Sequence, residues 1–394
     1  MSKKEIEKLL SRGVTNLEVK KDLEQKLSRG KPLRVKLGID PTGSDLHLGH
    51  GVVLRKLRQF QDRGHQIIFL FGGFTATIGD PSGKNQARPP LSLEQVQKNS
   101  RDYLAQAAKI IDIDKVEIRN NREWLEKLSS SELMKLVAQK SVQQILARRD
   151  FQERIRSKTD ILLQELLYPL LQGYDSVALG CDIEIGGNDQ LFNLLVGRDL
   201  QKKYRSKNVQ DILTMELIEG TDGVQKMSKS LNNYISLSEV PEVIFGKLMS
   251  IPDSLMMKCF ECLTDIDLKQ AKKMIAATPR DAKIFLAKNI ITWLYDSTQA
   301  DRAQQDFYTK FVVKEIPKKI REIKLAIGSM GILDLITKVA KFAPSNSEAR
   351  RIIMSRGVKF DGEIVDDPKF FAKISTSHVL QVGKKKFVRI VSKK

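Results

Sequence analysis

The most constraining feature of the chain is an alternation of apolar runs and one amphipathic stretch within residues 33–73. The run LRVKLGID at 33–40 predicts a short buried strand, and the loop PTGSDLHLGH leads into the helical pattern GVVLRKLRQFQDRG. The apolar run QIIFLFGG at 66–73 predicts a second strand. Strand, loop, helix and strand form the βαβ unit of a parallel sheet, in which ligands bind at the carboxyl ends of the strands.

Two later segments complete the predicted domain. Residues 91–171 are charged and mostly helical in pattern, and the segment VALGCDIEIGGNDQ at 177–190 then returns to an apolar strand that ends in two glycines. We therefore expect an α/β fold with a Rossmann-type parallel-sheet catalytic domain over 1–240, in which 91–171 is a helical insertion.

The rest of the chain predicts two further domains. Helical periodicity dominates from about residue 241, with amphipathic runs such as LKQAKKMIAA, so an all-α domain is expected over 241–330. The segment GSMG at 328–331 has the small residues that separate domains, and we place a boundary there. Residues 331–394 predict a small α+β module.

The overall composition excludes several classes of protein. No apolar run reaches the roughly 18 residues that a membrane helix needs, and the start MSKKEIEKLLSRG lacks the apolar stretch of a secretory signal. A cytoplasmic protein with no membrane partner is expected. The three cysteines, Cys181, Cys259 and Cys262, are too few and odd in number for a disulfide framework.

Cys259 and Cys262 form a C-x-x-C pair with two possible interpretations. A zinc site needs two more ligands, and no second pair or Cys/His cluster lies nearby in the sequence. The alternative is two small apolar residues on one face of a helix, where positions three apart are neighbours. We favour the second interpretation and predict no metal site.

The charge of the chain is strongly positive. With 67 lysines and arginines against 48 acidic residues, the net charge is +19, and +8 of this lies in residues 331–394. A positive excess of this size attracts polyanions, so a nucleic-acid partner is the first expectation. The alternative is that the basic residues are spread over a solvated surface.

The strongest local motif is His47-Leu48-Gly49-His50 at the start of the predicted helix. The two imidazoles share one face near a helix N-terminus, where free N–H groups and the helix dipole favour a phosphate. Gly49 lets a nucleotide approach the backbone closely. The alternatives are a metal pair, which lacks a visible third ligand, and two purely structural histidines.

A second motif, Lys226-Met227-Ser228-Lys229-Ser230, lies in a loop predicted over 220–232. Two ammonium groups on such a loop can neutralise the charge that develops on a leaving pyrophosphate. Taken alone, this lysine-rich segment has the composition of a solvated surface loop.

Together the two motifs resemble the HIGH and KMSKS boxes of the class I aminoacyl-tRNA synthetases. Within that class the chain is most similar to the tyrosyl enzymes of bacterial type, in the KMSKS-containing subgroup. The similarity lies in GIDPTGSDLHLGH (38–50), IGDPSGKNQAR (78–88), YPLLQGYD (168–175) and IGGNDQ (185–190). The resemblance implies that the chain joins tyrosine to tRNA(Tyr) with ATP, as a homodimer, and that the domain over 241–330 faces the anticodon.

The resemblance also implies residues that bind tyrosine. Asp80, Tyr168 and Gln172 would hold its α-amino group, and Asp175 would accept a hydrogen bond from its phenol. Such an acceptor left unpaired penalises phenylalanine, and tyrosyl enzymes are the standard example of this discrimination. At Lys36 the sequence departs from the tyrosine that many family members carry, which puts a second contact to the phenol in doubt.

For the nucleotide, the resemblance implies two sets of residues. Those around ATP are Gly38, Asp40, Gly49, Gly187, Asp189, Gln190, Met227, Ser228 and Lys229. Those that stabilise the transferring phosphates are Thr42, His47, His50, Lys84, Arg88, Lys226 and Lys229. Mg²⁺ is expected with the ATP and not in a dedicated protein site.

The segment SNSEARRIIMSRGVKFDGEIV at 345–365 resembles a small RNA-binding module found in a ribosomal protein and in pseudouridine synthases. Arg350, Arg351, Arg356 and Lys359 fall on its matching helix and turn. The alternative for this module is a dimerisation or capping domain.

The implied mechanism begins with in-line attack of the tyrosine carboxylate on the α-phosphate of ATP, followed by transfer to a terminal ribose hydroxyl of the tRNA. Two alternatives remain open from the sequence. One is the tryptophanyl homologue, against which Asp175 and the C-terminal module argue. The other is a catalytically silent RNA-binding protein with the same fold.

Overall fold

The structure is a computed structural model that describes residues 1–81, 91–311, 320–375, 377–383 and 386–393. Its contacts divide the chain into two compact units, 1–304 and 305–394, which are described separately. Within the described residues, no helix combines the length and the apolar character needed to cross a membrane.

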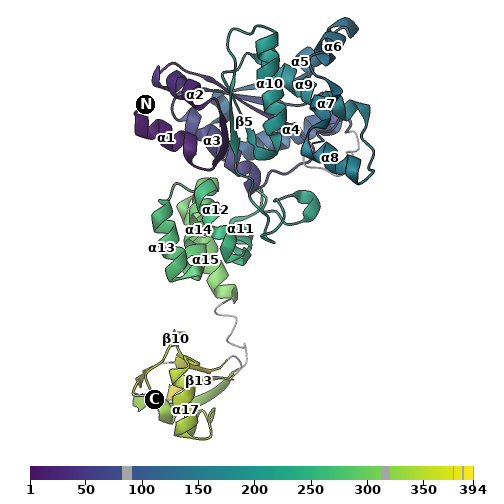
Figure 1. The fold of residues 1–394 in the computed structure, drawn as a ribbon. Helices are drawn as coiled ribbons and strands as arrows, with labels where there is room; N and C mark the ends of the chain where they lie inside the picture. The colour runs from purple at the N-terminus through teal and green to yellow at the C-terminus, as the bar shows by residue number, and fades with distance from the viewer. Residues whose placement is uncertain (82–90, 312–319, 376, 384–385, 394) are drawn as a thin grey trace. The chain divides into compact units, whose positions relative to one another are not determined.

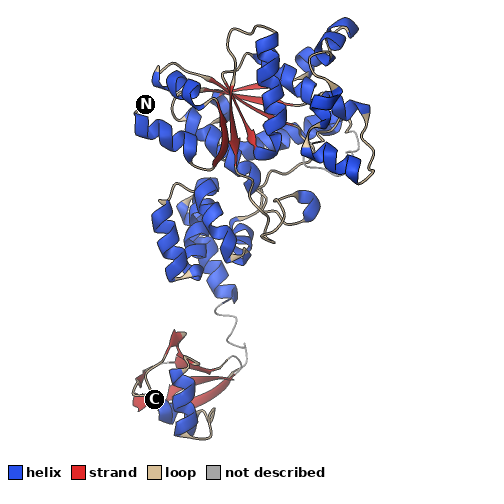
Figure 2. Ribbon diagram, viewed as in Figure 1, coloured by secondary structure: helices blue, strands red, loops and turns tan. Residues whose placement is uncertain are grey.

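A six-stranded sheet forms the centre of the first unit (Figures 1 and 2). Its strand order is β1-β6-β5-β2-β3-β4, and all neighbours are parallel except β1, which pairs antiparallel with β6. The strands are β1 (Val14–Glu18), β2 (Arg34–Ile39), β3 (Gln66–Phe71), β4 (Val116–Asn120), β5 (Ile183–Gly187) and β6 (Asp211–Met215). The predicted Rossmann-type sheet is confirmed. The strand order reverses between β2 and β5, because β3 and β4 lie on one side of β2, whereas β5 and β6 lie on the other.

Helices cover both sides of this sheet (Figure 2). The described helices that precede β6 are α1 (Lys3–Ser11), α2 (Lys20–Ser28), α3 (Leu48–Gln61), α4 (Leu93–Ala107), α5 (Arg122–Leu125), α6 (Ser130–Val137), α7 (Val142–Leu146), α8 (Arg149–Arg156), α9 (Leu163–Leu179) and α10 (Leu191–Lys203). Because both faces are covered, the central strands are almost wholly buried, and every residue of β6 is buried.

The segment predicted as a helical insertion contains one strand that its pattern did not indicate. Strand β4 lies at the edge of the sheet and pairs with β3 over five residues. Its sequence, VEIRN, is short, half-exposed and carries two charged residues, so it lacks the apolar run that identifies a central strand. The insertion limits of 91–171 therefore include part of the sheet.

Five helices follow the sheet, as the periodicity predicts: α11 (Pro241–Ser250), α12 (Asp253–Leu263), α13 (Leu268–Ala277), α14 (Pro279–Leu294) and α15 (Ser297–Phe311). Cys259 and Cys262 are both buried on α12, where burial raises the pKa of each thiol to about 12. They pack as neutral apolar side chains, which agrees with the helix-face interpretation.

The second unit is a small α+β module with two sheets. One has the order β10-β9-β12-β13-β7, and the other pairs β8 with β11. Its elements are β7 (Arg321–Ala326), β8 (Gly328–Gly331), α16 (Ile332–Asp334) with the π-helical turn η6 (Leu335–Val339), α17 (Asn346–Met354), β9 (Val358–Phe360), β10 (Glu363–Ile364), β11 (Phe371–Ile374), β12 (Ser377–Val382) and β13 (Lys386–Lys393).

The expectation that GSMG separates two domains is wrong in one respect. Residues Gly328–Gly331 form strand β8, which is paired along its whole length with β11. Strand β7, which precedes it, pairs with β13 and also belongs to the module. Small residues suit a linker, but here backbone hydrogen bonds to a later strand, which local sequence cannot reveal, decide their structure. The remaining domain limits stay a prediction.

A close contact between α9 and α10 gives a first test of this packing. A Cβ added at Gly173 would lie 2.9 Å from Leu200 Cδ1 and 3.2 Å from the backbone nitrogen of Gly197, whereas Gly246 on α11 has open space around it. Gly246→Ala should stabilise the protein by about 0.5–1 kcal/mol through helix propensity. The free energy of unfolding of Gly173→Ala should be lower than that of Gly246→Ala by about 1–3 kcal/mol, the usual cost of overpacking.

Urea unfolding followed by tryptophan fluorescence measures this difference, because both tryptophans, Trp124 and Trp293, lie in the first unit. Equal stability of the two alanine variants would contradict the close helix contact.

Candidate active site

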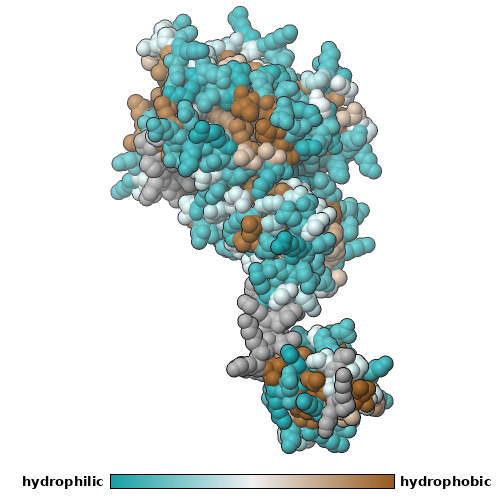
Figure 3. Space-filling model, turned by 180° about the vertical axis from the view of Figure 1, so that it is seen from behind, coloured by the Kyte–Doolittle hydropathy of each residue, from teal (hydrophilic) through white to brown (hydrophobic). Residues whose placement is uncertain are grey.

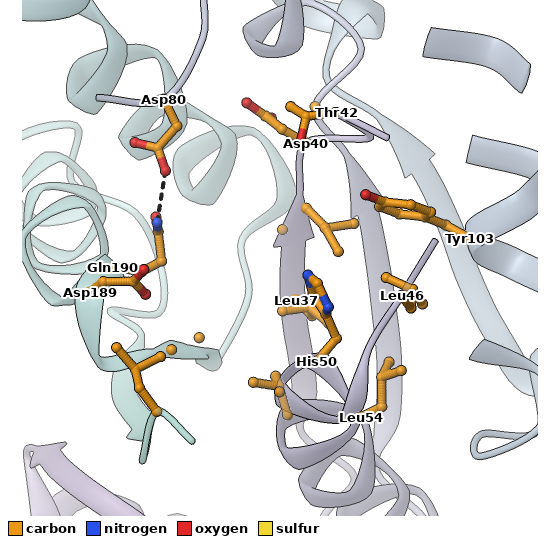
Figure 4. A pocket seen from close by; sticks show the side chains of 18 of the residues that line it. Leu37, Asp40, Thr42, Leu46, His50, Leu54, Asp80, Tyr103, Asp189 and Gln190 are labelled. Carbon is orange, nitrogen blue, oxygen red and sulfur yellow. Dashed lines mark hydrogen bonds between the residues drawn. The ribbon is translucent and has the colours of Figure 1, made fainter. Parts of the chain in front are cut away.

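A pocket of about 300 Å³ opens at the carboxyl ends of β2 and β5 (Figure 4). Sixteen residues singled out from the sequence line it: Gly38, Asp40, Thr42, His47, Gly49, His50, Asp80, Tyr168, Gln172, Asp175, Gly187, Asp189, Gln190, Lys226, Met227 and Ser228. The fold thus brings residues from distant segments into one cavity, at the reversal point where a parallel sheet binds its ligand.

One predicted ligand-binding residue that the structure describes, Lys229, is not part of the lining of this pocket. Lys229 lies next to it, with its ammonium 5.4 Å from the ring centroid of Tyr103, which does line the pocket. Lys84 and Arg88 lie outside the described residues. Their predicted contact with phosphates therefore stays a prediction.

The HLGH segment forms the entry to α3, as predicted. Its two rings lie 3.9 Å apart between centroids, and the backbone N–H of His47 donates to His50 Nδ1 at 3.2 Å. A Cβ at Gly49 would lie 2.9 Å from the His47 ring, so only glycine fits under this imidazole.

Both histidines are neutral at physiological pH. Burial lowers the pKa of His50 to about 4, and burial with the neighbouring His50 and lysines lowers that of His47 further. Among the described residues, His47 Nδ1 is buried without a hydrogen-bond partner. Neutral imidazoles with an open position suit hydrogen bonding to a nucleotide better than proton abstraction. No group of three or more potential metal ligands occurs in the described structure.

The segment that follows KMSKS, residues 235–237, is joined directly to the HLGH segment. An antiparallel bridge pairs His47 with Ser236, and the amide of Leu48 donates to the carbonyl of Ile235 at 3.0 Å. The amide of Leu237 in turn donates to Leu46 at 2.9 Å. Two motifs that are far apart in the sequence therefore enter the pocket side by side.

Asn233 shapes the loop that carries the second motif. Its side-chain oxygen accepts from the backbone N–H of Ser228 at 2.8 Å, and its amide donates to Asp222 at 2.8 Å. The side chain is buried, so these bonds fix the loop without help from solvent. Lys226, in the same loop, forms an ion pair with Asp189 at 3.2 Å.

Asp175 closes the inner end of the pocket. It lies on α9, is 3% exposed, and accepts hydrogen bonds from Trp124 Nε1 at 2.8 Å and Asn121 Nδ2 at 3.3 Å. Burial raises the pKa of this carboxyl to about 7, although Lys36 and the two hydrogen bonds act in the opposite direction. It therefore changes charge near physiological pH.

Tyr168, Gln172 and Asp175 follow one another along one face of α9, at the helical spacing i, i+4 and i+7. The hydroxyl of Tyr168 donates to Asp40 at 2.8 Å, and burial raises the pKa of this phenol, so it stays protonated. Gln172 accepts from Asn193 at 2.9 Å.

Asp80 lies across the pocket from α3. It accepts from Gln190 at 2.8 Å, and Figure 4 shows this pair on the side opposite His50 and Tyr103. The polar groups of the pocket are therefore arranged around the cavity and held by one another.

Lys36 does not line the pocket. Its ammonium is fully buried, forms an ion pair with Glu184 at 2.7 Å and donates to Ser176 Oγ at 2.9 Å. Burial alone would lower the pKa of Lys36, but Glu184 and the neighbouring acidic groups outweigh it and raise the pKa above its usual value. The side chain therefore offers no direct contact to a ligand in this pocket.

The four predicted RNA-binding residues lie in the second unit. Arg350 and Arg351 are exposed on α17, Arg356 is exposed just after it, and Lys359 is half-buried on β9. Arg356 lies 3.8 Å from Asp366, an exposed ion pair that contributes little to stability. The helix and turn occur where the sequence predicts them.

Several residues that line or support the pocket were missed from the sequence, among them Tyr103, which lines it, Asn121 and Trp124, which donate to Asp175, and Asn233, which holds the KMSKS loop. Tyr103 and Trp124 come from the segment predicted as an insertion, and no local motif surrounds them. Only the three-dimensional fold brings them to the ends of the parallel strands. For Asn233 the sequence offered one signal, which is a polar side chain shortly after the KMSKS segment.

Comparisons with known proteins agree with this geometry. Residues 28–312 match the family described as tRNA synthetases class I (W and Y), and residues 332–376 match the S4 domain. The chain is 47% identical to a tyrosine–tRNA ligase of Bordetella avium, over 97% of this chain and 95% of that protein. It is 46% identical to one of Francisella tularensis, over 99% of both chains.

Solved structures show the same fold at lower identity. A truncated mitochondrial tyrosyl-tRNA synthetase of Aspergillus nidulans is similar with a TM-score of 0.64 and 20% identity, over 79% of this chain and 95% of that one. The tyrosyl-tRNA synthetase of Archaeoglobus fulgidus, complexed with L-tyrosine, gives a TM-score of 0.62 at 22% identity, over 76% and 99% of the two chains.

The sheet, the joined motifs and the first family together define a class I tRNA synthetase for tryptophan or tyrosine. The curated relatives decide between the two amino acids, and the chain belongs to the tyrosine–tRNA ligases that carry an S4 domain. Its substrates are accordingly tyrosine, ATP and tRNA(Tyr).

The pKa of Asp175 predicts how tyrosine binding depends on pH. If the ionised carboxylate accepts the phenol hydrogen, the dissociation constant for tyrosine should rise as the pH falls from 8 to 6. With a pKa of about 7 the ionised fraction falls roughly tenfold over this range, and affinity should weaken by up to that factor.

Calorimetric titration with tyrosine in the absence of ATP measures this directly. Asp175→Asn, which cannot ionise, is the control and should bind weakly at every pH. A constant wild-type affinity between pH 6 and 8 would contradict the assigned role of the carboxylate.

Proposed function

We propose that the pocket activates tyrosine by attack of its carboxylate on the α-phosphate of ATP. A bond forms between a carboxylate oxygen and the phosphorus, and the bond to the bridging oxygen breaks, which releases pyrophosphate and leaves tyrosyl-adenylate. A terminal ribose hydroxyl of tRNA(Tyr) then attacks the carbonyl carbon and releases AMP. The observation that carries this proposal is the pairing of HLGH with residues 235–237, which follow KMSKS, beside a cavity that both motifs line together with Asp175.

Tyrosine would bind at the α9 side of the pocket. Asp175 would accept the phenol hydrogen, and Asp80, Tyr168 and Gln172 would surround the α-ammonium. The hydrogen bonds of the buried carboxylate support this assignment. Trp124 and Asn121 both donate to it, and an ionised carboxylate can only accept hydrogen bonds. Phenylalanine would leave the remaining acceptor position of this carboxylate without a donor, which disfavours its binding.

ATP would bind between β5 and the HLGH segment. Asp189 would accept from the ribose hydroxyls, and Gly38, Asp40, Gly49, Gly187, Gln190, Met227 and Ser228 would surround the nucleotide. The ion pair between Asp189 and Lys226 supports one shared site. A ribose hydroxyl can replace Lys226 as the partner of Asp189, and a phosphate can replace Asp189 as the partner of Lys226.

Charge stabilisation would come from the residues that point toward the phosphates. These are Thr42, His47, His50, Lys226 and Lys229, with Lys84 and Arg88 as further predicted members. The two imidazoles are neutral and would act as hydrogen-bond donors, and the lysines would neutralise the leaving pyrophosphate. Mg²⁺ would enter with the ATP phosphates as part of the substrate.

Replacement of Lys229 by alanine tests the assigned chemistry. Adenylate formation should slow by about 10²–10³-fold, the usual cost of removing one preorganised group that stabilises the transition state. Affinity for tyrosine and for tRNA should change by less than about twofold, because neither binds mainly through this side chain. Single-turnover pyrophosphate release measures the first step, and filter binding measures the tRNA affinity.

Lys207→Ala is the matched control, since it removes one exposed lysine outside the pocket. Unchanged adenylate formation in Lys229→Ala would contradict the proposal and favour the catalytically silent alternative.

The second unit would bind the tRNA backbone through Arg350, Arg351, Arg356 and Lys359. Arg350→Ala/Arg351→Ala should weaken tRNA binding and reduce the slope of log K against log salt by about 0.7–0.9 per lost phosphate contact. Arg350→Lys/Arg351→Lys keeps both charges and should retain most of the slope. Pyrophosphate release should stay unchanged in both variants.

If the alanine variant binds tRNA with an unchanged salt slope but no longer self-associates, the dimerisation alternative for this module holds instead.

A homodimer is also proposed for the chain. Large apolar side chains are exposed near the start of α9, where Leu163 is 74% and Leu162 46% exposed, and Figure 3 shows apolar side chains gathered on one face of the first unit. Sedimentation velocity tests this, since a species at the 44.7 kDa of one chain would contradict a dimer. The predicted cytoplasmic location stays a prediction.

A further inference from the structure

A buried pair of opposite charges lies directly beneath the inner end of the pocket. Lys36 on β2 and Glu184 on β5 are partners in the parallel register, and both residues are at most 1% exposed. Their charged atoms lie 2.7 Å apart. Burying two ions costs free energy that their attraction does not generally repay, so such a pair calls for a role beyond stability.

The pair is linked by hydrogen bonds to the residue that follows Asp175. Ser176 Oγ accepts from Lys36 at 2.9 Å and donates to Glu184 at 2.8 Å, while Gln210 also donates to Glu184 at 2.5 Å. Because Ser176 and Asp175 are consecutive on α9, this network fixes the helix turn that aims the carboxylate into the pocket.

Several charged and titratable groups surround Asp175, and they act in different directions. Trp124 and Asn121 donate to it from the α5 region, and Lys36 adds a positive charge from β2. Glu184 on β5 opposes ionisation less strongly than Lys36 favours it. Tyr168 on the same helix is protonated and bonded to Asp40, so it adds no charge of its own.

We propose that Lys36, held by Glu184 and Ser176, is a positioning residue that selects tyrosine over phenylalanine by favouring the negative charge on Asp175. It acts through that carboxylate and not by contact with the substrate, since its ammonium is fully buried and outside the pocket lining. The inference rests on the proposed role of Asp175 as acceptor of the phenol hydrogen.

The test compares five proteins: wild type, Lys36→Met, Glu184→Gln, the double variant of these two positions, and Asp175→Asn. Loss of the cation in Lys36→Met should move the acidic limb of tyrosine binding to higher pH by about one unit, which is up to tenfold in affinity below pH 7. Loss of the anion in Glu184→Gln should move the limb to lower pH. The double variant should fall between wild type and Lys36→Met, because the effect of Lys36 is the larger of the two.

The kinetic readout separates this role from a merely structural one. In Lys36→Met the ratio of kcat/KM for tyrosine to that for phenylalanine should fall up to tenfold below pH 7, through the KM for tyrosine. The KM for ATP and kcat at saturating tyrosine should change by less than about twofold. A general loss of packing would lower activity with both amino acids and would not move a pH limb.

The results separate failure of the proposed acceptor role of Asp175 from failure of the inference about Lys36. If Asp175→Asn leaves the preference for tyrosine over phenylalanine unchanged, the proposed acceptor role fails, and this inference fails with it. If Asp175→Asn abolishes the preference but the limb stays fixed in Lys36→Met, only the inference is overturned. If Lys36→Met does not fold, the Glu184→Gln and double variants decide. An acidic limb of tyrosine binding that stays at the wild-type pH in both of them would overturn the inference.

Discussion

The antiparallel pairing of Leu46–Leu48 with Ile235–Leu237 is the contact on which the active site depends. It joins the segment after β2 to the segment after the KMSKS loop, and its four apolar side chains are completely or almost completely buried. The end of α4 and the turn after it support both sides of the pairing, because Gln106 accepts from the amide of Leu46 and Lys109 donates to the carbonyl of Leu237. This pairing brings the lysines of KMSKS and the histidines of HLGH to the same pocket.

Charge is distributed unevenly around the resulting cavity. The nucleotide side has neutral imidazoles and basic side chains, whereas the side near α9 has carboxylates that are buried or held by neighbouring amides. Burial keeps the two imidazoles neutral and the Tyr168 phenol protonated, whereas it raises the pKa of Asp175 to about 7 and leaves this carboxyl poised between two protonation states. If Asp175 accepts the phenol hydrogen as proposed, selection of the phenol should depend on the buried charges that act on this carboxylate, among them Lys36.

The sequence predicts the site better than it predicts the fold around it. The residues of HLGH and KMSKS were singled out because their types and spacing are tied to chemistry, and Asp175 and Asp189 because of the family resemblance; these segments and residues line or adjoin one pocket. Strands β2, β3 and β5 were found because they are apolar and buried. Strand β4 and the GSMG strand were missed, since pairing with a distant strand decides their structure. Trp124 and Tyr103 were missed because only the tertiary fold brings them to the pocket.

The most direct test of the account is amino-acid-dependent exchange of pyrophosphate into ATP in the absence of tRNA. The pocket as described should support exchange with tyrosine and not with tryptophan or phenylalanine, because only tyrosine presents a hydroxyl to Asp175. Exchange that is absent with tyrosine, or equal with phenylalanine, would contradict the central claim that this cavity recognises and activates tyrosine.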